Sequence, residues 1–563
     1  MTPDALERLL GDPYDTANPY GFAAAVARDE QDAFPEELCA KLREAGFHLN
    51  YLPREWGGRF ESFDRSMLLV RTAARRDLNV MPGTMFGITA ATCLALHGSP
   101  EQRKRAAEIL TEGGAIGFAL SEAGHGSDLL ANTTRLEPTA DGWELTGTKW
   151  LVGLGHRCEA AYVVARTGER GPAAFSAVLV DLTTGPGLTR GPLLPTAGMR
   201  GIDFADLVFD RFPVPREALV GREGEALESV MKAQQVVRVM SMAGSLGIAD
   251  TALRLTLDHA AGRRVGRTTV LASPYPRREL AIASAALLAA DAVALAASRG
   301  IHVVPETFSV WGCAAKHVVA ESTEEVLRRC GGVLASRAVL RDNLFQKLQR
   351  DAAVVRVVDT SPLANLRSFA SQLQFLRGAG PHQSAAPPRG ATSPHAPAAT
   401  TQIRTIFDLD EPLPPYAPDR LDLNARGQDP VTAALPCIAP EALARLTAAT
   451  DLPAAHLVAR LVAALEGLPA ELAAADRDTG LMDLADRFTW LHAATACLCL
   501  WWANEANPFF TTAWLQATLA HLLARATGTD PRHEGPAQLP ALDITTDLHD
   551  HDQLFSALPV HLA

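Results

Sequence analysis

The 563-residue sequence predicts a mainly helical α+β protein built from several domains. Its length exceeds that of one ordinary domain, because domains usually hold about 100–200 residues. Hydrophobic residues make up 47% of the chain and charged residues 21%, a globular composition that excludes disorder over most of the length. Helix-like and strand-like blocks follow one another along the chain, which indicates separate helical and β domains.

Residues 1–113 are expected to form an N-terminal helical domain. Pro35 suits the first turn of a helix, Leu38 and Leu42 would share one of its faces, and Gly46 would stop it. Apolar segments further along this stretch would supply the rest of the domain's core.

Residues 114–217 change character and predict a central β domain. Short runs of β-forming residues, such as residues 162–165, are separated by Asp-Gly, Thr-Gly and Gly-Pro pairs that favour turns. Helical spacing returns in residues 218–377, in long segments rich in Ala, Leu and Val at 230–257 and 278–298. We therefore expect a second helical domain after the β domain.

The last third of the chain predicts a linker followed by an acidic helical extension. Residues 378–404 are rich in proline and alanine and have almost no bulky apolar residue, which is typical of a linker. Residues 405–563 carry a charge of roughly −13. In this extension Asp451 is expected to cap a helix that ends at Gly467, and a later helix is expected over residues 512–526.

Charge and cysteine usage favour a soluble cytoplasmic protein. The net charge of −12 gives no general attraction to nucleic acid or anionic membranes, and the eight cysteines, without a CxxC pair, predict free thiols. Residues 1–15 are polar and acidic, unlike a signal peptide. The longest apolar runs are expected to be too short to cross a bilayer or to be interrupted by charge, as Asp291 interrupts residues 282–298. We interpret the HDHD segment at residues 549–552 as a polar tail rather than a metal site.

Residues 118–128, with the sequence FALSEAGHGSD, are the most informative stretch. Glycine and other small residues let backbone N–H groups approach a ligand closely, and Ser121 and Ser127 add hydroxyl donors. Trp150 follows soon afterwards and could cover a planar ring by stacking. Such a loop suits a heteroaromatic ring or an anionic diphosphate, whereas glycine-rich segments in general are more often plain turns.

The order and spacing of further motifs give a more specific interpretation. Residues 25–375 resemble the acyl-CoA dehydrogenase family of flavoproteins. The similarity lies in motifs spread over this range, namely LPREWGG at 52–58, HGSPEQR at 97–103, ALSEAGHGSD at 119–128, GTKWLV at 147–152, GG at 331–332 and RD at 350–351. So many motifs in the same order make coincidence a poor explanation.

The resemblance implies an N-terminal α-helical domain, a central β-barrel-like domain and a C-terminal four-helix bundle, with FAD bound between the last two. It also implies a homodimer or homotetramer. Gly331 and Gly332 resemble a loop that meets the FAD of a second chain, and Arg263 or Arg264 resembles an arginine that reaches that FAD's pyrophosphate. The residues that the resemblance places at the cofactor are Phe118, Leu120, Ser121, Gly126, Ser127, Trp150, Val152, Arg263, Gly331, Gly332 and Thr360.

The catalytic base is a point at which the sequence departs from this family. The resemblance places a glutamate nine residues after the arginine of the RD motif, and here that position is Asp359. Its side chain is one methylene shorter, and it is also suited to capping a helix that starts near Pro362. Val237 stands at the alternative base position of some relatives and cannot accept a proton. Asp359 is therefore the one base candidate that the resemblance supplies.

The resemblance implies FAD-dependent α,β-dehydrogenation of an acyl thioester carried by CoA or by an acyl carrier protein. Asp359 would remove the α-proton, and the flavin would take the β-hydride. Electron-transfer flavoprotein or O2 would reoxidise the flavin, and the departures at the site fit a specialised, secondary-metabolic pathway. Two alternatives stay open: a flavin monooxygenase that uses O2 on the same fold, and a non-catalytic assembly or binding subunit.

Overall fold

The computed structural model describes residues 1–183, 185–358, 360–378, 396–476 and 479–563, with the backbone alone for residues 374–378 and 396–400. Two compact units make up the chain. The first unit comprises Met1–Met240 and Val358–Thr360, and the second comprises the described residues of Ser241–Val357 and Ser361–Ala563. Helix α8 (Ala226–Gly262) begins in the first unit and continues in the second.

The first unit begins with short helices. They are α1 (Pro3–Leu10), α2 (Phe22–Glu30), α3 (Glu36–Glu44), α4 (Phe63–Ala74), α5 (Val80–Met85), α6 (Ile88–His97) and α7 (Pro100–Thr111). Helix α3 confirms the predicted one, because it begins directly after Pro35 and buries Leu38 and Leu42 completely. Gly46 lies just beyond its end with a φ of 77°, a left-handed value that glycine adopts readily.

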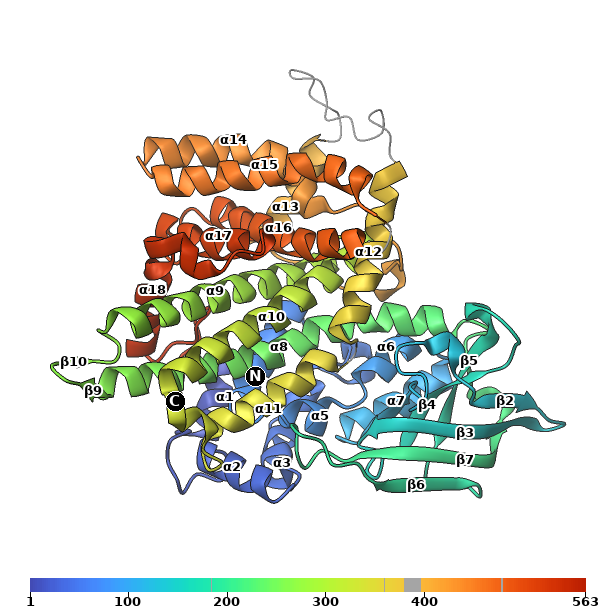
Figure 1. Ribbon diagram of the computed structural model, residues 1–563. Coiled ribbons are helices and arrows are strands. Elements are labelled where there is room, and N and C mark those ends of the chain that lie inside the picture. Colours follow the sequence, from blue (N-terminus) through green and yellow to red (C-terminus); the bar gives the residue numbers. More distant parts are fainter. Residues whose placement is uncertain (184, 359, 379–395, 477–478) are drawn as a thin grey trace. The chain divides into compact units, whose positions relative to one another are not determined.

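A single mixed sheet follows the N-terminal helices. Its strands are β1 (Ile116–Ala119), β2 (Arg135–Pro138), β3 (Gly142–Gly153), β4 (Ala160–Arg166), β5 (Phe175–Asp181), β6 (Leu188–Leu193), β7 (Phe204–Pro215) and β8 (Leu219–Val220). The strand order is β6-β7-β3-β2-β4-β5-β8, with β1 paired to β4. Figure 1 shows β6, β7 and β3 side by side. The predicted barrel is not confirmed, because β6 and β8 end the order and do not pair with each other within the described residues.

The second unit contains the rest of α8 and the helices that follow it. These are α9 (Pro274–Val303), α10 (Phe308–Leu334), α11 (Leu344–Val357) and α12 (Pro362–Gly378). Between α8 and α9 the chain forms a small hairpin of β9 (Arg264–Val265) and β10 (Thr268–Thr269), which projects from the helix ends in Figure 1.

The extension consists of helices that pack on α9, α10 and α12. They are α13 (Ala396–Phe407), α14 (Pro430–Ala448), α15 (Leu452–Ala474), α16 (Thr479–Ala503), α17 (Thr512–Ala526) and α18 (Leu539–Asp550). Figure 1 shows α16 and α17 between α9 on one side and the pair α14 and α15 on the other. One buried apolar cluster combines side chains of α10 and α12 with those of α15 and α16. The extension therefore belongs to the core of the second unit.

Two predicted boundaries in this region are wrong. Helix α15 does not end at Gly467 but continues to Ala474, because the packing of Leu468 and Leu472 outweighs the local cost of glycine. The predicted linker also ends too late, because α13 already begins at Ala396. The helix predicted over residues 512–526 is confirmed as α17, and Asp451 caps α15 by accepting the Ala454 N–H.

Single polar residues in the apolar helices hold the extension. Arg299 of α9 donates to four backbone carbonyls at or beyond the end of α13, those of Thr405, Ile406, Asp408 and Glu411. These include carbonyls at a helix C-terminus, which have no partner inside the helix.

The C-terminal tail is held in the same way. Asp291 of α9 accepts bonds from the Ser556 hydroxyl at 2.8 Å and the Ala557 N–H at 3.0 Å. The HDHD segment at residues 549–552 is polar and mostly exposed, as interpreted, and His549 pairs there with Asp258, whereas Phe555 beyond it is fully buried.

Three helical segments are long and apolar enough to cross a membrane by length and composition, namely Val80–His97, α8 and α9. The expectation that the apolar runs would be too short, or too interrupted by charge, is therefore wrong by these criteria, although Asp291 does lie within α9. The most apolar part of α8 and that of α9 are both entirely buried inside the protein. The Asp291 carboxylate of α9 is also buried, and it accepts hydrogen bonds there.

Candidate active site

Residues 118–152, which were predicted to contribute to the cofactor site, lie within the first unit. Phe118 lies on β1 directly beside Tyr162 of β4, and their rings stack with centroids 5.9 Å apart and planes 19° from parallel. Tyr162 is fully buried, with its hydroxyl in hydrogen-bond contact with Cys93 and Ser229, so it gives Phe118 a fixed support. Phe118 itself is only half-buried, which leaves part of its ring available to a ligand.

Trp150 lies on β3, and its backbone joins the loop that follows β1. Its N–H donates to the Ser121 carbonyl at 2.9 Å. Val152, two residues on, is buried, and a Cβ added to Gly117 would lie 3.3 Å from its methyl carbon. The structure thus brings Phe118, Leu120, Ser121, Trp150 and Val152 together on adjacent segments.

A buried ion pair fixes the shape of this loop. The Lys149 ammonium donates to Glu122 Oε1 at 2.9 Å and to the Leu120 carbonyl at 3.1 Å. Glu122 also accepts bonds from the Thr133 N–H and hydroxyl and from the Thr134 N–H, all at 2.8–2.9 Å. Both ends of the loop are therefore tied to one carboxylate.

The electrostatics of this pair favour an ionised glutamate. Burial alone would raise the pKa of Glu122, but the Thr133 N–H, the Lys149 charge and the bonds from Thr134 outweigh it and lower the pKa to about 2. Burial lowers the pKa of Lys149, and the Glu122 charge opposes that shift.

Strand β3 carries a bulge at Trp150 and Leu151. Lys149 pairs with Leu207 of β7 and Val152 pairs with Ala205, so Trp150 and Leu151 together face Asp206. Leu151 has a φ of 55°, in the left-handed region that side chains other than Gly and Asn rarely adopt. Its N–H donates to the Asp206 carboxylate at 3.2 Å.

The loop from Ala123 to Asp128 is largely exposed and offers donors to a ligand. The N–H groups of Gly124 and Ser127 and the hydroxyls of Ser121 and Ser127 have no hydrogen-bond partner among the described residues. A Cβ added to Gly124 or Gly126 would meet nothing within 4 Å, so the loop surface there is open. Open donors beside two half-buried aromatic rings fit a planar heteroaromatic ring joined to a diphosphate.

The turn that was predicted to carry the base is described only in part. Asp359 lies outside the described residues. Its neighbour Thr360 donates from its N–H to the Val358 carbonyl and from its hydroxyl to Gln234 of α8, at 3.0 and 3.4 Å. Thr360 is thus fixed to α8 within the first unit.

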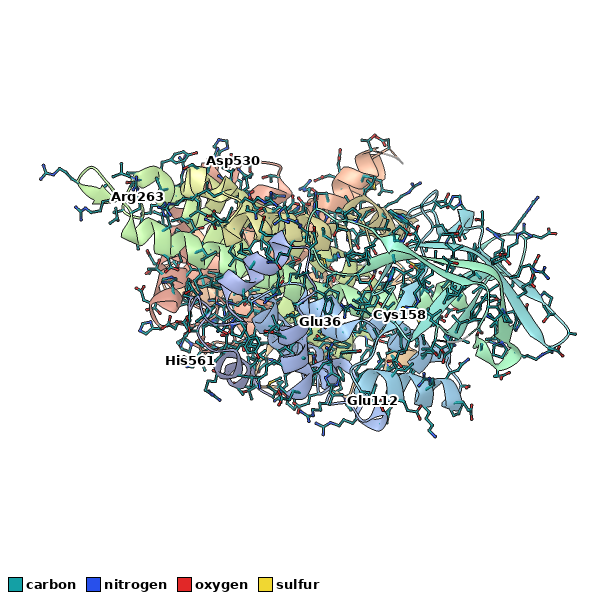
Figure 2. The ribbon with its side chains drawn as sticks, turned by 90° about the horizontal axis from the view of Figure 1, so that it is seen from below. Glu36, Glu112, Cys158, Arg263, Asp530 and His561 are labelled. Carbon is teal, nitrogen blue, oxygen red and sulfur yellow. The ribbon has the colours of Figure 1, made fainter. Side chains whose placement is uncertain are left out.

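The remaining predicted cofactor residues belong to the second unit. Arg263 is exposed where α8 ends, and Figure 2 shows it at the projecting hairpin. Arg264 forms part of that hairpin and donates to the Arg267 carbonyl. Gly331 and Gly332 lie in the last turn of α10, so the prediction that they form a loop is wrong.

Sequence reasoning missed Glu122, Lys149 and Asp206 as organisers of the site. A signal for the ion pair was present, because Lys149 lies four residues after buried Leu145 and therefore on the inward face of the strand. An inward lysine needs an acidic partner, and Glu122 was the acid in the adjacent motif. Asp206 gave no such signal, because its role depends on the register between β3 and β7.

Known families and proteins share this architecture. Three family descriptions match in chain order: "Acyl-CoA dehydrogenase, N-terminal domain" at residues 21–114, "middle domain" at 117–212 and "C-terminal domain" at 225–359. The human mitochondrial short-chain specific acyl-CoA dehydrogenase is 26% identical over 375 residues, which cover 65% of this chain and 89% of the human protein.

Solved structures show the same fold. Butyryl-CoA dehydrogenase from Megasphaera elsdenii has a TM-score of 0.60 at 21% identity, over 66% of this chain and 98% of its own. PigA with FAD and proline has a TM-score of 0.59 at 18% identity, over 63% and 95%. The prolyl acyl carrier protein oxidase AnaB has a TM-score of 0.58 at 17% identity, over 62% and 93%. The three family matches together cover more than half of the sequence, and the chain therefore belongs to the acyl-CoA dehydrogenase family.

Proposed function

We propose that this protein is an FAD-dependent enzyme that dehydrogenates an acyl thioester between its α and β carbons. The observation that carries the proposal is the open loop of residues 123–128, with donors that lack partners among the described residues, beside half-buried Phe118 and Trp150. Family membership supports the same activity. The names of the similar proteins include an acyl-CoA dehydrogenase and an acyl carrier protein oxidase, so the thioester is a CoA or a carrier-protein ester.

The first unit supplies the groups that would hold the cofactor. Ser121 and the backbone beside it would hydrogen-bond the ring edge, Trp150 would cover a ring face, and Gly126 and Ser127 would lie by the phosphates. FAD, when bound, would supply the acceptor for the β-hydride. The Glu122–Lys149 pair holds the loop in place before any ligand arrives, so less ordering is needed on binding.

We further propose Asp359 as the base that removes the α-proton. Its support is the position nine residues after Arg350, and Thr360 beside it is fixed to Gln234. Arg263, Gly331 and Gly332 are proposed to contact the cofactor of a second copy of the chain. We therefore propose a homodimer or homotetramer, located in the cytoplasm.

Anaerobic titration of the purified holoprotein tests this function. Bound FAD should lose its absorbance on addition of butyryl-CoA or of a carrier-protein acyl thioester, and comparison of the two shows which carrier the site takes. The Asp359→Ala variant should lose this bleaching by at least a hundredfold, while Asp141→Ala, an exposed acid in the same unit, should keep it.

The alternatives give different results in the same experiments. O2 consumption with an external flavin reductase, unaffected by Asp359→Ala, would replace the proposal with a monooxygenase. Protein that takes up no FAD would indicate a non-catalytic subunit.

A further inference from the structure

The bulge in β3 gives one acidic residue an unusual place next to the site. Asp206 of β7 faces two residues on β3, because the pairing skips from Lys149 to Val152. It also faces two residues on β6, because Arg190 pairs with Leu207 and Leu193 pairs with Ala205. Asp206 therefore sits between irregularities in both of its neighbouring strands.

The bulge decides which side chains of β3 point inward. In a regular strand Leu151 would share the inward face with Lys149, and Val152 would point to the other face. Instead Val152 is buried and Leu151 is 36% exposed, so the extra residue has shifted the alternation by one. The direction of Trp150, which lies inside the bulge, depends on this shift.

Leu151 needs an external contact to keep this conformation. Its left-handed φ is unfavourable for a branched side chain, and the bulge removes the regular ladder partner of its N–H. The Asp206 carboxylate replaces that partner at 3.2 Å. An ionised acceptor makes a stronger bond than a neutral one.

Contacts from β6 limit the movement of Asp206. Gly191 approaches it so closely that an added Cβ would lie 3.2 Å from the Asp206 Cβ and 3.5 Å from its nitrogen. The Gly191 carbonyl is in turn fixed by the His156 imidazole at 2.6 Å. The Asp206 Cβ and backbone therefore have little room on the side of Gly191, while the carboxylate accepts the Leu151 N–H.

We propose that Asp206 is a positioning residue for Trp150: by accepting the Leu151 N–H it maintains the left-handed bulge that directs the indole and keeps the Trp150 backbone N–H on the Ser121 carbonyl. The inference concerns the protein without ligand. Only its consequence for FAD rests on the proposed function.

The direct test is 19F NMR of the full chain labelled with 5-fluorotryptophan. The Trp150 resonance is assigned by its loss in Trp150→Phe. It should shift or broaden in Asp206→Ala, and it should stay in place in Asp206→Asn, which keeps an oxygen acceptor, and in Asp210→Ala, an exposed acid on the same strand. An unchanged Trp150 resonance in Asp206→Ala overturns the proposal.

The same spectra distinguish a change at Trp150 from a failure of Asp206→Ala to fold, and they do not depend on the proposed function. The resonances of the other tryptophans report on the fold. If Asp206→Ala does not fold, the same substitution is made in a Leu151→Gly chain, where glycine adopts the left-handed conformation readily. Restored folding with a fixed Trp150 resonance supports the role, and continued failure to fold overturns it.

FAD affinity of the apoprotein gives a second readout. Asp206→Ala should weaken FAD binding roughly tenfold, and this loss should disappear in the Trp150→Phe background, because residues that act through one another are not additive. Additive losses overturn the proposal. If the wild-type protein binds no FAD, the proposed function fails while the NMR result still decides the role of Asp206.

Discussion

Two buried charge clusters, one in each unit, use different bonding partners. In the first unit Glu122 and Lys149 share their bonds mainly with backbone groups, those of Leu120, Thr133 and Thr134. In the second unit the Arg329 guanidinium of α10 donates to three carboxylates, those of Glu279, Glu325 and Asp530.

The kind of bonding partner indicates the structural role of each cluster. A carboxylate that binds backbone N–H groups fixes the course of a loop, and that loop is the proposed cofactor site. A guanidinium shared by three carboxylates joins side chains of α9 and α10 to Asp530, the residue that caps the segment Pro531–Gln538, so it holds the extension against the earlier helices. The first cluster shapes a site, whereas the second joins segments that are far apart in sequence.

Loss of Arg329 should have the largest effect. Arg329→Met removes the cation that all three carboxylates share, and breaking a buried pair costs about 3–5 kcal/mol. The remaining bonds, from Arg532 to Glu279 and Asp530 and from Arg328 to Glu325, place the expected loss at the lower end of that range. The urea midpoint of the whole chain, followed by circular dichroism, should fall accordingly. Arg328→Met is the matched control, because Arg328 bonds to the same Glu325 carboxylate but is itself 56% exposed, so its loss should cost less than about 1 kcal/mol. Equal effects would show that the network does not hold the unit together.

Glu122→Gln should have the second largest effect. It should lower the free energy of unfolding by about 3 kcal/mol at pH 7, because Lys149 then stays buried beside a neutral partner. The loss depends on pH. The pKa of Glu122 falls from 4.5 to about 2 on folding, so its ionisation stabilises the folded protein above pH 4.5. That stabilisation disappears as the pH falls from 4.5 to 2.

Urea unfolding at several pH values checks this dependence. The difference between wild type and Glu122→Gln should be full at pH 7 and should shrink steadily below pH 4.5. Glu137→Gln, an exposed acid on β2, should show no comparable difference at any pH. A constant difference down to pH 3 would contradict the assignment of the shift to folding.

Local signals in the sequence were enough for many elements. Helices α3 and α17 follow from a proline or threonine at the start and an apolar face, and strand β4 follows from a run of β-forming residues between turns. The motif order also located the loop of residues 118–128. Each of these features depends on residues that are close together in the chain.

The features that could not be predicted depend on distant partners. Arg299 looks like an isolated charge in an apolar helix, and its acceptors lie more than 100 residues later. The bulge at Leu151 depends on register with β7, and helix α15 passes Gly467 because of packing partners elsewhere. The extension was predicted as a separate acidic module for the same reason, although its buried faces complete the second unit.

Asp291→Ala should have the smallest effect on stability, and it tests most directly whether the bonding partners of a buried charge determine its role. Like Glu122 it is a buried acid that accepts from a hydroxyl and a backbone N–H, but it lies in the second unit and binds the C-terminal tail at Ser556 and Ala557. Loss of these charge-assisted bonds should cost about 2 kcal/mol. Hydrogen exchange of the tail amides should accelerate, while Asp547→Ala, an exposed acid on α18, should leave it unchanged. Asp291→Ala could instead destabilise the whole second unit as much as Arg329→Met does. That result would show that the effect of losing a buried charge depends on the unit in which it lies and not on whether its partners are backbone groups or side chains.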